Sequence, residues 1–335
     1  MRIVVTGATG NVGTALLRRL ATEPDVELHG VSRRPPPEPE PPYDIEWTPL
    51  DLSKSGAEEP LTDVLRGADA VVHLAWRIQP GHDETALYRT NVRGSERVFA
   101  AALNAGVPHL VHMSSVGAYS PAAKDREVDE HWPTGGVPTS YYSRHKAAVE
   151  RQLDRIQYDN PDLVISRIRP ALILQPDAAT EIKRYFLGPL VPSSLLGVKL
   201  PVLPVPKDLV LQFVHSDDVA EAVALVLQDR VGGPLNLAAE PVVTPEVLAE
   251  VLHTRHVPIP SPVLRGLAWA SWNLRLQPTS HGWVDLALTS PLLDTSRARD
   301  ELGWTPRHDA RHVLRDLLDG MARKDGEPAS PALHP

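Results

Sequence analysis

The chain has 335 residues, of which 42% are apolar, and it carries a formal net charge of −8 with no cysteine. This length exceeds the usual size of one compact domain, so we expect a large domain with a smaller companion. The charges are spread along the chain without a basic block, which argues against a nucleic acid partner. The lack of cysteine excludes disulfides, thiolate metal sites and cysteine nucleophiles.

The sequence also contains no signal for a membrane. No apolar run reaches the length of a transmembrane helix, and the N-terminus enters a strand at once, which leaves no room for a signal peptide. We therefore expect a cytoplasmic protein without a membrane partner.

A glycine-rich turn follows the first predicted strand. Residues 3–5 form a β-branched run typical of a buried parallel strand, and a helical pattern begins at about Asn11. Gly7, Gly10 and Gly13 would supply the tight turn, the approach of the backbone to a pyrophosphate and the contact between helix and strand. The helix would point its positive end at the phosphates, which predicts a dinucleotide site. The predicted cofactor contacts of this stretch are Thr6, Gly7, Gly10, Asn11, Val12 and Gly13.

The second predicted strand, residues 26–31, ends in Ser32, Arg33 and Arg34. Enzymes specific for NAD usually place an acidic residue here for the ribose 2′-hydroxyl, whereas arginine can pair with the 2′-phosphate of NADP. Two adjacent arginines without an acid favour NADP(H) and leave NAD(H) open. The alternative is a solvated basic pair at the entrance of a loop.

Strands and helices continue to alternate along the chain. Strands are predicted over residues 45–50, 70–74 and 109–113, and a long helix over residues 87–105. This alternation predicts a parallel, doubly wound α/β sheet, whose ligands bind at the carboxyl ends of the strands. The residues at those ends, or on the long helix beside them, are further predicted cofactor contacts: Asp51, Leu52, Leu74, Ala75, Trp76, Asn91 and Ser114.

A helix that begins near Thr139 or Ser140 carries Tyr142 and Lys146. Their spacing of four places both side chains on one helix face. A lysine cation near the phenol would lower the pKa of the tyrosine, which a residue that transfers protons needs. Ser115, at the end of the neighbouring strand, could donate a hydrogen bond to a carbonyl oxygen on which negative charge develops.

Together these motifs resemble the extended branch of the short-chain dehydrogenase/reductase superfamily, which holds the NAD-dependent epimerase/dehydratase family. The resemblance covers nearly the whole chain. It depends on these ordered matches: Thr6-Gly7-Ala8-Thr9-Gly10-Asn11-Val12-Gly13, Asp51-Leu52, His73-Leu74-Ala75, Asn91-Val92-x-Gly94, Ser114-Ser115, Tyr142-x-x-x-Lys146, Arg169-Pro170, Phe213 to Ala220 and Leu302-Gly303-Trp304-Thr305-Pro306.

The resemblance implies a Rossmann domain, residues 1–170 and 212–238, and a smaller C-terminal α/β substrate domain, residues 171–211 and 239–322. Residues 323–335 have the composition of a tail and are expected to be disordered. The resemblance also implies a catalytic set of Ser115, Tyr142 and Lys146, and often a homodimer built from the helices around Asn91 and Tyr142. Tyr142, Lys146 and Pro170 complete the predicted cofactor contacts.

Three departures from the family pattern bear on the substrate. Relatives that act on nucleotide sugars commonly have Arg-Asp before the Phe-Val-His segment, where the arginine holds the pyrophosphate; this chain has Leu211 and Gln212. His145 replaces the small residue usual before the lysine. The substrate region is also strongly apolar, which indicates either the core of the small domain or an apolar pocket: Tyr185, Phe186, Leu187, Leu190, Val191, Leu195, Leu196, Val198, Leu200, Leu264, Leu267, Trp269, Trp272 and Leu274.

No metal site is predicted. His308 and His312 have the spacing of a metal pair on a helix, but no glutamate follows the first histidine, and a helix start after Pro306 explains them. Asp217 and Asp218 lie at a junction from strand to helix and are expected to cap that helix.

The sequence therefore predicts an NADP(H)-dependent oxidoreductase that moves a hydride between nicotinamide and a carbonyl or secondary alcohol of a largely apolar small molecule. An NAD-dependent nucleotide-sugar epimerase or dehydratase is the alternative, and would gain if Lys183, Arg184, Lys199 or Lys207 replaced the missing arginine. A regulator that binds cofactor without turnover is the third hypothesis, which the catalytic set disfavours.

Overall fold

A computed structural model shows how these predicted elements are arranged. Within the part of the chain that it describes, no helix is both long and apolar enough to cross a bilayer. The described residues are 1–37, 41–79, 81–183, 202–277, 279–327, 330 and 332–333.

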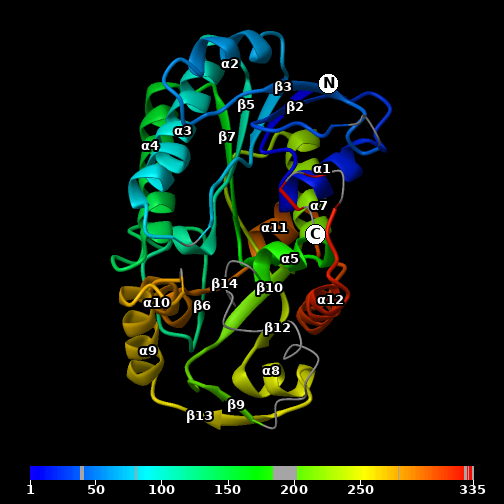
Figure 1. The fold of residues 1–335 in the computed structure, drawn as a ribbon. Helices are drawn as coiled ribbons and strands as arrows, with labels where there is room; N and C mark the ends of the chain where they lie inside the picture. The colour runs from blue at the N-terminus through cyan, green and yellow to red at the C-terminus, as the bar shows by residue number, and fades with distance from the viewer. Residues whose placement is uncertain are drawn as a thin grey trace.

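A parallel sheet forms the upper half of the molecule (Figure 1). Among the described residues it has seven strands in the order β11-β7-β5-β4-β1-β2-β3, and every neighbouring pair is parallel. This order confirms the predicted doubly wound sheet. The strands are β1 (Arg2–Thr6), β2 (Glu27–Ser32), β3 (Glu46–Pro49), β4 (Ala70–His73), β5 (His109–Met113), β7 (Val164–Pro170) and β11 (Gly233–Leu237).

Helices cover both faces of this sheet (Figure 1). Their bounds are α1 (Asn11–Leu20), α2 (Glu58–Leu65), α3 (Glu84–Asn104), α4 (Tyr141–Asp159) and α7 (Ser216–Asp229). One face carries α1 and α7, and the other carries α2, α3 and α4. Side chains cap the first turns of α3, α4 and α7; at α4, for example, the Ser140 hydroxyl accepts from the Ser143 amide.

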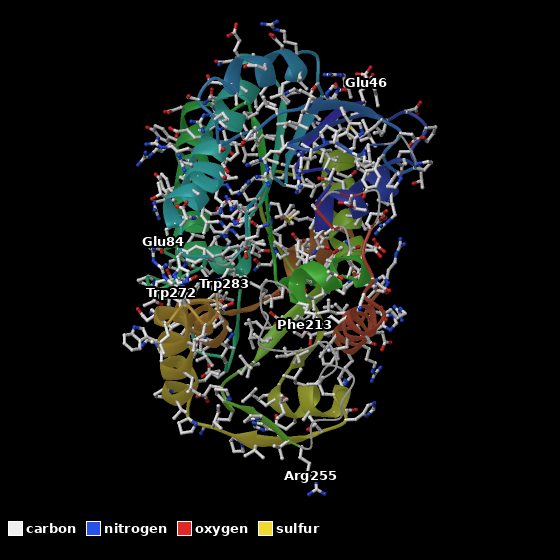
Figure 2. All side chains as sticks on the ribbon, viewed as in Figure 1. Glu46, Glu84, Phe213, Arg255, Trp272 and Trp283 are labelled. Atoms are coloured by element: carbon white, nitrogen blue, oxygen red, sulfur yellow. The ribbon has the colours of Figure 1, made fainter. Side chains whose placement is uncertain are left out.

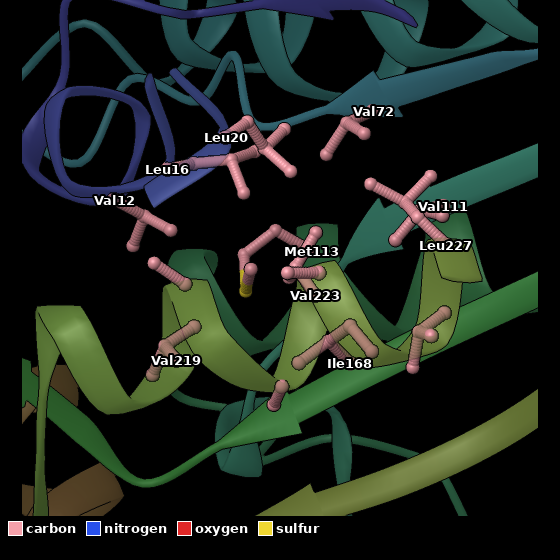
Figure 3. Close-up of a cluster of buried hydrophobic side chains, with 14 of the residues drawn as sticks. Val12, Leu16, Leu20, Val72, Val111, Met113, Ile168, Val219, Val223 and Leu227 are labelled. Carbon is pink, nitrogen blue, oxygen red and sulfur yellow. The ribbon is translucent and has the colours of Figure 1, made fainter. Parts of the chain in front are cut away.

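Alternate strand residues build two separate hydrophobic cores, because successive side chains of a strand point to opposite faces. Ile3 and Val5 of β1 belong to the core under α1 and α7, whereas Val4 belongs to the core under α2, α3 and α4. Figure 3 shows the first core, in which α1 and α7 side chains meet those of the strands. Burial on both faces explains why the strands read as continuous apolar runs.

The lower half of the molecule is built on smaller sheets. Strand β10 pairs parallel with β8 and antiparallel with β12, and α12 packs on this sheet to close a third core that includes Phe213. The remaining strands pair as β13 with β9 and as β14 with β6. The bounds are β6 (Glu127–Val128), β8 (Leu172–Leu174), α5 (Ala179–Ile182), β9 (Val202–Val205), β10 (Leu211–His215), β12 (Ala239–Val243), α8 (Pro245–Val251), β13 (Arg255–Pro258), α9 (Ser261–Asn273), α10 (His281–Thr289), β14 (Leu292–Leu293), α11 (Ser296–Leu302) and α12 (Ala310–Arg323).

The division between the halves differs in detail from the expected one. The lower half corresponds to the expected substrate domain and is called the substrate half below. Strand β10 lies in the small sheet, so residues 212–215, expected in the Rossmann domain, pair within the lower half. Conversely, Ala298, Leu302 and Trp304 pack into the core under α1 and α7. The chain thus crosses between halves at more points than the family pattern implies.

The segment after α12 does not match the expected disorder where the structure describes it. Ser330 and Leu333 are buried, and the Ser330 hydroxyl donates to the Thr9 carbonyl at 2.5 Å. Hydrogen bonds within the segment, from the Ala332 and Leu333 amides to Ser330 Oγ, shape a turn. Composition missed this packing because its partner lies more than three hundred residues away in sequence.

Candidate active site

The glycine-rich turn has no space for side chains at two positions. Gly7 has a φ of +75°, and a Cβ there would lie 2.6 Å from the Ala75 amide nitrogen. A Cβ on Gly13 would lie 2.5 Å from the carbonyl oxygens of both Gly7 and Ala8. The turn therefore brings the N-terminus of α1 against the ends of β1 and β4, and leaves a cradle at the helix N-terminus that suits a pyrophosphate.

A cleft opens in front of this turn, at the carboxyl ends of β1, β2, β3 and β4. Eight of the predicted cofactor contacts line it. They are Gly7, Gly10, Arg33, Asp51, Leu52, Leu74, Ala75 and Trp76. Backbone at the turn, apolar side chains from the strand ends and two arginines, Arg33 and Arg77, form a surface suited to an adenosine diphosphate.

Several other predicted contacts support the cleft without lining it. Thr6 is buried, and its hydroxyl lies 2.7 Å from His73 Nδ1, so it joins β1 to β4. Val12 packs into the core under α1 (Figure 3). The Asn91 side chain accepts from the Arg77 amide at 2.7 Å and donates to the Arg77 carbonyl at 2.9 Å, which fixes the loop after β4.

Asn11 connects the turn to the substrate half. Its side chain donates to the Ile173 carbonyl at 3.2 Å and accepts from the Ser216 hydroxyl at 2.6 Å. The Gln175 side chain donates to the Asn11 carbonyl at 3.0 Å. The polar groups of Asn11 are thus occupied by β8, by the residue after it and by α7, rather than aimed into the cleft. Pro170 ends β7 beside Leu237 and likewise does not line the cleft that the described residues form.

The two arginines after β2 occupy different places. Arg33 lines the main cleft, and both Arg33 and Arg34 line a small adjoining cleft with Thr9 and Ser32. Burial raises the pKa of Asp51, but hydrogen bonds from Ser53 and the charges of Arg33 and Lys54 outweigh it and hold that pKa below its ordinary value. The positive charge of Arg33 therefore acts on Asp51 at the end of β3, where the ribose and adenine would lie.

The cleft also has lining residues that the sequence reasoning missed. Most of them lie within a few residues of a predicted strand end, so including the neighbours of each strand end would have identified them. Ala332 has no such signal, because the chain reaches the cleft there only through the packing of Ser330 and Leu333. The missed residues are Thr9, Val31, Ser32, Leu50, Arg77, Thr90 and Ala332.

The three predicted catalytic residues converge beside this cleft. Ser115 follows β5 and caps a short helical turn, its hydroxyl accepting from the Gly117 amide at 3.0 Å. Tyr142 packs so closely on this turn that a Cβ on Gly117 would lie 2.8 Å from Tyr142 Cε1. Burial raises the pKa of Tyr142 to about 12, although an interaction with the Ser115 hydroxyl opposes the rise. The phenol is therefore protonated at neutral pH.

Lys146 lies one helical turn further along α4 and is buried. Its ammonium donates to the Met113 carbonyl at 2.7 Å and lies 3.6 Å from the ring centroid of Trp76. Burial lowers the pKa of Lys146 to about 7, against the opposing charge of Glu150. We expected Lys146 to lower the pKa of Tyr142, but the pKa of Tyr142 is raised, because burial of the phenol is the dominant effect.

A buried ionic network lies behind Lys146. Glu150 accepts from the Ser114 hydroxyl at 2.5 Å and from Arg169 Nε and Nη2, both at 2.9 Å. Burial raises the pKa of Glu150, but the hydrogen bonds and charge of Arg169, with smaller contributions from Ser114 and Arg167, hold it below its ordinary value. The Ser114 hydroxyl is therefore bound within this network. The family match at Arg169-Pro170 did not by itself reveal that Arg169 pairs with Glu150.

The departures from the family pattern have structural explanations. Leu211 packs against the core closed by α12, and Gln212 is buried and exchanges two hydrogen bonds with the backbone of Leu293. Neither residue offers a cation to a ligand. His145 is also buried, and burial lowers its pKa to about 4, so it is neutral beside Tyr88 and Tyr141.

The apolar substrate region is only partly described. Residues 185–200, with Arg184 and Lys199, lie outside the described residues. On α9, no residue is buried, and Leu267, Trp269 and the following Leu274 are more than half exposed. The described members of this set on α9 therefore form neither a domain core nor an enclosed pocket.

Asp217 and Asp218 were expected to cap α7, but the His215 side chain accepts from the Asp217 amide and caps this helix instead. Asp218 accepts from the backbone amides of Arg307 and His308, at 2.9 and 3.1 Å, and from His308 Nδ1 at 3.0 Å. The His308 ring stacks on that of His215, with centroids 4.2 Å apart. Asp218 thus fixes the loop before α12.

Comparison with known proteins agrees with this geometry. The family model described as "NAD dependent epimerase/dehydratase family" matches residues 3–238. An uncharacterized protein of Mycobacterium tuberculosis is 28% identical over 319 residues; the match covers 95% of this chain but 30% of that protein, so the chain spans less than a third of its length.

Two further similar proteins match along nearly their whole length. A dTDP-6-deoxy-L-talose 4-dehydrogenase (NAD(P)(+)) of Kitasatospora kifunensis is 27% identical over 327 residues, with 94% of each chain covered. The solved structure of a UDP-glucose 4-epimerase of Thermus thermophilus, in complex with NAD, superposes with a TM-score of 0.69 at 21% identity and covers 96% of this chain and 99% of that one. At this identity the superposition shows a shared fold.

Proposed function

The chain belongs to the NAD-dependent epimerase/dehydratase family, and on this premise we propose that it is an NADP(H)-dependent oxidoreductase acting on a carbonyl or secondary alcohol of a largely apolar small molecule. The observation that carries the proposal is the convergence of Ser115, Tyr142 and Lys146 beside a cleft built on Gly7 and Gly13. The cradle at these glycines fits the pyrophosphate of a dinucleotide. When bound, the nicotinamide supplies or accepts the hydride.

Tyr142 would be the proton donor for reduction. Its raised pKa keeps the phenol protonated, so it can give a proton to the carbonyl oxygen as that oxygen gains electrons. The Ser115 hydroxyl would donate a hydrogen bond to the same oxygen. In the oxidative direction Tyr142 would have to accept the proton of the alcohol. Only the phenolate form can accept a proton, and the raised pKa of Tyr142 makes this form rare at neutral pH.

Lys146 would act through its charge. Burial brings its pKa to about 7, close to neutral pH, so small changes around it alter its charge. Its ammonium lies between the Met113 carbonyl and the Trp76 ring, at the end of the cleft next to Tyr142. From this position it would hold the ribose of the nicotinamide and favour electron gain at the substrate oxygen.

Preference for NADP(H) is proposed from Arg33 and Arg34. Together with Ser32 and Thr9 they line the small cleft adjoining the main one, which would accept a 2′-phosphate. Any nucleotide that copurifies with the protein should be identified by mass spectrometry and removed, and the protein then titrated with NADPH and NADH by fluorescence. Arg33→Glu should weaken NADPH binding at least tenfold more than NADH binding, and the exposed Arg66→Glu should change neither.

The substrate is proposed to lack a pyrophosphate, because Leu211 and Gln212 are both committed to protein contacts. A panel of apolar ketones with NADPH tests this proposal. The absence of turnover with every ketone and secondary alcohol tested would overturn the oxidoreductase proposal. Turnover in Tyr142→Phe equal to that of the wild type would overturn the assigned role of Tyr142.

The second candidate is an NAD-dependent nucleotide-sugar epimerase or dehydratase, which the solved UDP-glucose 4-epimerase favours. Such an enzyme returns the hydride to its own substrate. The dTDP-6-deoxy-L-talose 4-dehydrogenase relative favours a nucleotide-sugar substrate, but with net transfer of the hydride. Tightly retained NAD⁺ in the purified protein, and conversion of a UDP- or dTDP-sugar without net change in NADH absorbance, would select this candidate.

A homodimer through α3 and α4 is also proposed. These helices pack side by side on one face of the sheet (Figure 1), with Tyr88 of α3 and Tyr158 of α4 exposed at 41% and 88%. Light scattering on a size-exclusion column would test it, and a monomer at micromolar concentration would contradict it.

A further inference from the structure

The small half of the molecule reaches the active site through α10. Its second residue, Gly282, is buried against the turn that precedes α4: a Cβ there would lie 2.3 Å from the Thr139 carbonyl oxygen and 2.9 Å from Ser140 Cα. The two helices therefore start in backbone contact. This contact fixes the position of the next residue, Trp283, relative to the start of α4.

Trp283 contacts both tyrosines of α4. Its indole nitrogen donates to the Tyr141 hydroxyl at 3.1 Å, and its ring meets that of Tyr141 edge to face, with centroids 6.0 Å apart. The same indole packs on the ring of Tyr142, with centroids 5.1 Å apart and planes inclined by 34°. Trp283 lies where α10 meets the Rossmann half (Figure 2).

The Tyr142 ring is thus held from several elements. The backbone at Gly117 abuts its Cε1 edge, Trp76 meets it edge to face at 6.0 Å, and Trp283 packs against it from the small half. Gly117 and Trp76 belong to the Rossmann half, so only Trp283 among these contacts comes from the substrate half. Aromatic pairs at such distances contribute about 0.5–1.5 kcal/mol beyond buried area and prefer defined orientations.

We propose that Trp283 is a positioning residue of the active site: its indole, fixed by Gly282 and Tyr141, holds the ring of Tyr142 in the orientation for proton transfer. The inference rests on the proposed role of Tyr142 as proton donor. It assigns to the substrate half a direct influence on the chemistry, in addition to any contact with substrate. Misplacement of a catalytic group by about 1 Å can cost about a hundredfold in rate, so a residue that touches only the tyrosine can still govern turnover.

Steady-state kinetics separate positioning from substrate binding. Trp283→Leu should lower kcat about 10- to 30-fold, while KM and the dissociation constant of NADPH change less than threefold, because the orientation of Tyr142 acts on the chemical step. Trp283→Phe, which keeps an aromatic ring, should recover most of kcat. Trp269→Leu on α9, whose ring is 53% exposed, is the matched control and should match the wild type. An increase in KM alone, or no effect, would overturn the proposal.

A second readout does not need turnover. 3-Fluorotyrosine placed at position 142 reports the order of that ring through its ¹⁹F resonance. The signal should shift or broaden in Trp283→Leu, remain close to the wild type in Trp269→Leu, and move partway in Tyr141→Phe, which removes only the hydrogen-bond acceptor of the indole. An unchanged signal in Trp283→Leu would refute the positioning role even if the wild type reduced ketones. Conversely, a changed signal in a protein without turnover would support positioning while the oxidoreductase proposal failed.

Discussion

The cofactor cleft and helix α9 use glycine and tryptophan in opposite ways. At the cofactor cleft, Gly13 is enclosed so tightly that a Cβ would overlap two carbonyl oxygens, and Trp76 covers the ammonium of Lys146. On α9 of the substrate half, Gly266 has no atom within 4 Å of a Cβ position, and Trp269 is 53% exposed. Close packing at the cofactor cleft therefore leaves no space for a larger side chain at Gly13, whereas Gly266 on α9 has space for one. Trp283 is the point where the substrate half becomes as constrained as the cofactor half.

The largest effect should come from removing the phenol at the junction of the two halves. Tyr142→Phe should lower kcat about a thousandfold, because proton transfer by a positioned group contributes about 10²- to 10⁴-fold, while the dissociation constant of NADPH stays within threefold. Tyr158→Phe, on the same helix and 88% exposed, is the control. Turnover of Tyr142→Phe within tenfold of the wild type would show that another group moves the proton.

Burial of the Lys146 ammonium in the cofactor half should lower the free energy of unfolding. The pKa of Lys146 is about 7 in the folded protein and 10.5 ordinarily, so the unfolded chain binds the extra proton between these values. The free energy of unfolding should therefore rise as the pH increases from about 7 to 10.5, and the cost is fully present below pH 7. Lys146→Met should raise the free energy of unfolding by up to roughly 4 kcal/mol at pH 6, and by much less at pH 10.

Denaturant titration at the two pH values measures this difference. A Lys146→Met variant that is less stable than the wild type at pH 6 would contradict burial as the cause of the lowered pKa. Turnover should be lost in this variant at pH 6, where the wild type carries the charge at the end of the cleft.

Adding one methyl group in each half tests the contrast in packing. Gly13→Ala should destabilise the protein by about 1–3 kcal/mol and weaken NADPH binding, because the new Cβ overlaps the turn. Gly266→Ala, in the middle of α9, should stabilise the protein by up to about 1 kcal/mol, because alanine favours a helix and nothing obstructs it. Thermal unfolding and NADPH titration measure both, and equal effects at the two positions would remove the distinction between the halves.

The smallest expected effect concerns the C-terminal segment over the cleft. Ser330→Ala removes the hydrogen bond to the Thr9 carbonyl, and such a bond contributes about 0.5–1.5 kcal/mol. Its loss should therefore increase the rate of NADPH dissociation about 2- to 10-fold. Stopped-flow fluorescence measures the rate, and Arg323→Gln at the exposed end of α12 is the control. Unchanged dissociation would mean that the segment packs beside the cleft without contacting the cofactor.

Much of the cofactor half was predictable because its signals are local. A strand, a turn and a helix within residues 2–20 contain the whole cradle, and the i, i+4 spacing of Tyr142 and Lys146 follows from helix geometry alone. The doubly wound sheet and most of the cleft contacts at strand ends were accordingly predicted from the sequence. The side chain of Asn11, a predicted cofactor contact, bonds Ile173 and Ser216, and the sequence did not indicate these bonds because only the fold brings the partners together.

The sequence by itself determined the sheet, the glycine cradle and the positions of Ser115, Tyr142 and Lys146 along the chain, because each depends on neighbours a few residues away. Only the tertiary structure decided the direction in which the pKa values of Tyr142 and Lys146 shift, since a pKa depends on burial. It also decided that Trp283 meets Tyr142 and that Ala332 lines the cleft, contacts that join residues more than a hundred positions apart. Spacing in sequence determines which face of an element a side chain occupies, but what that face meets depends on how distant elements pack.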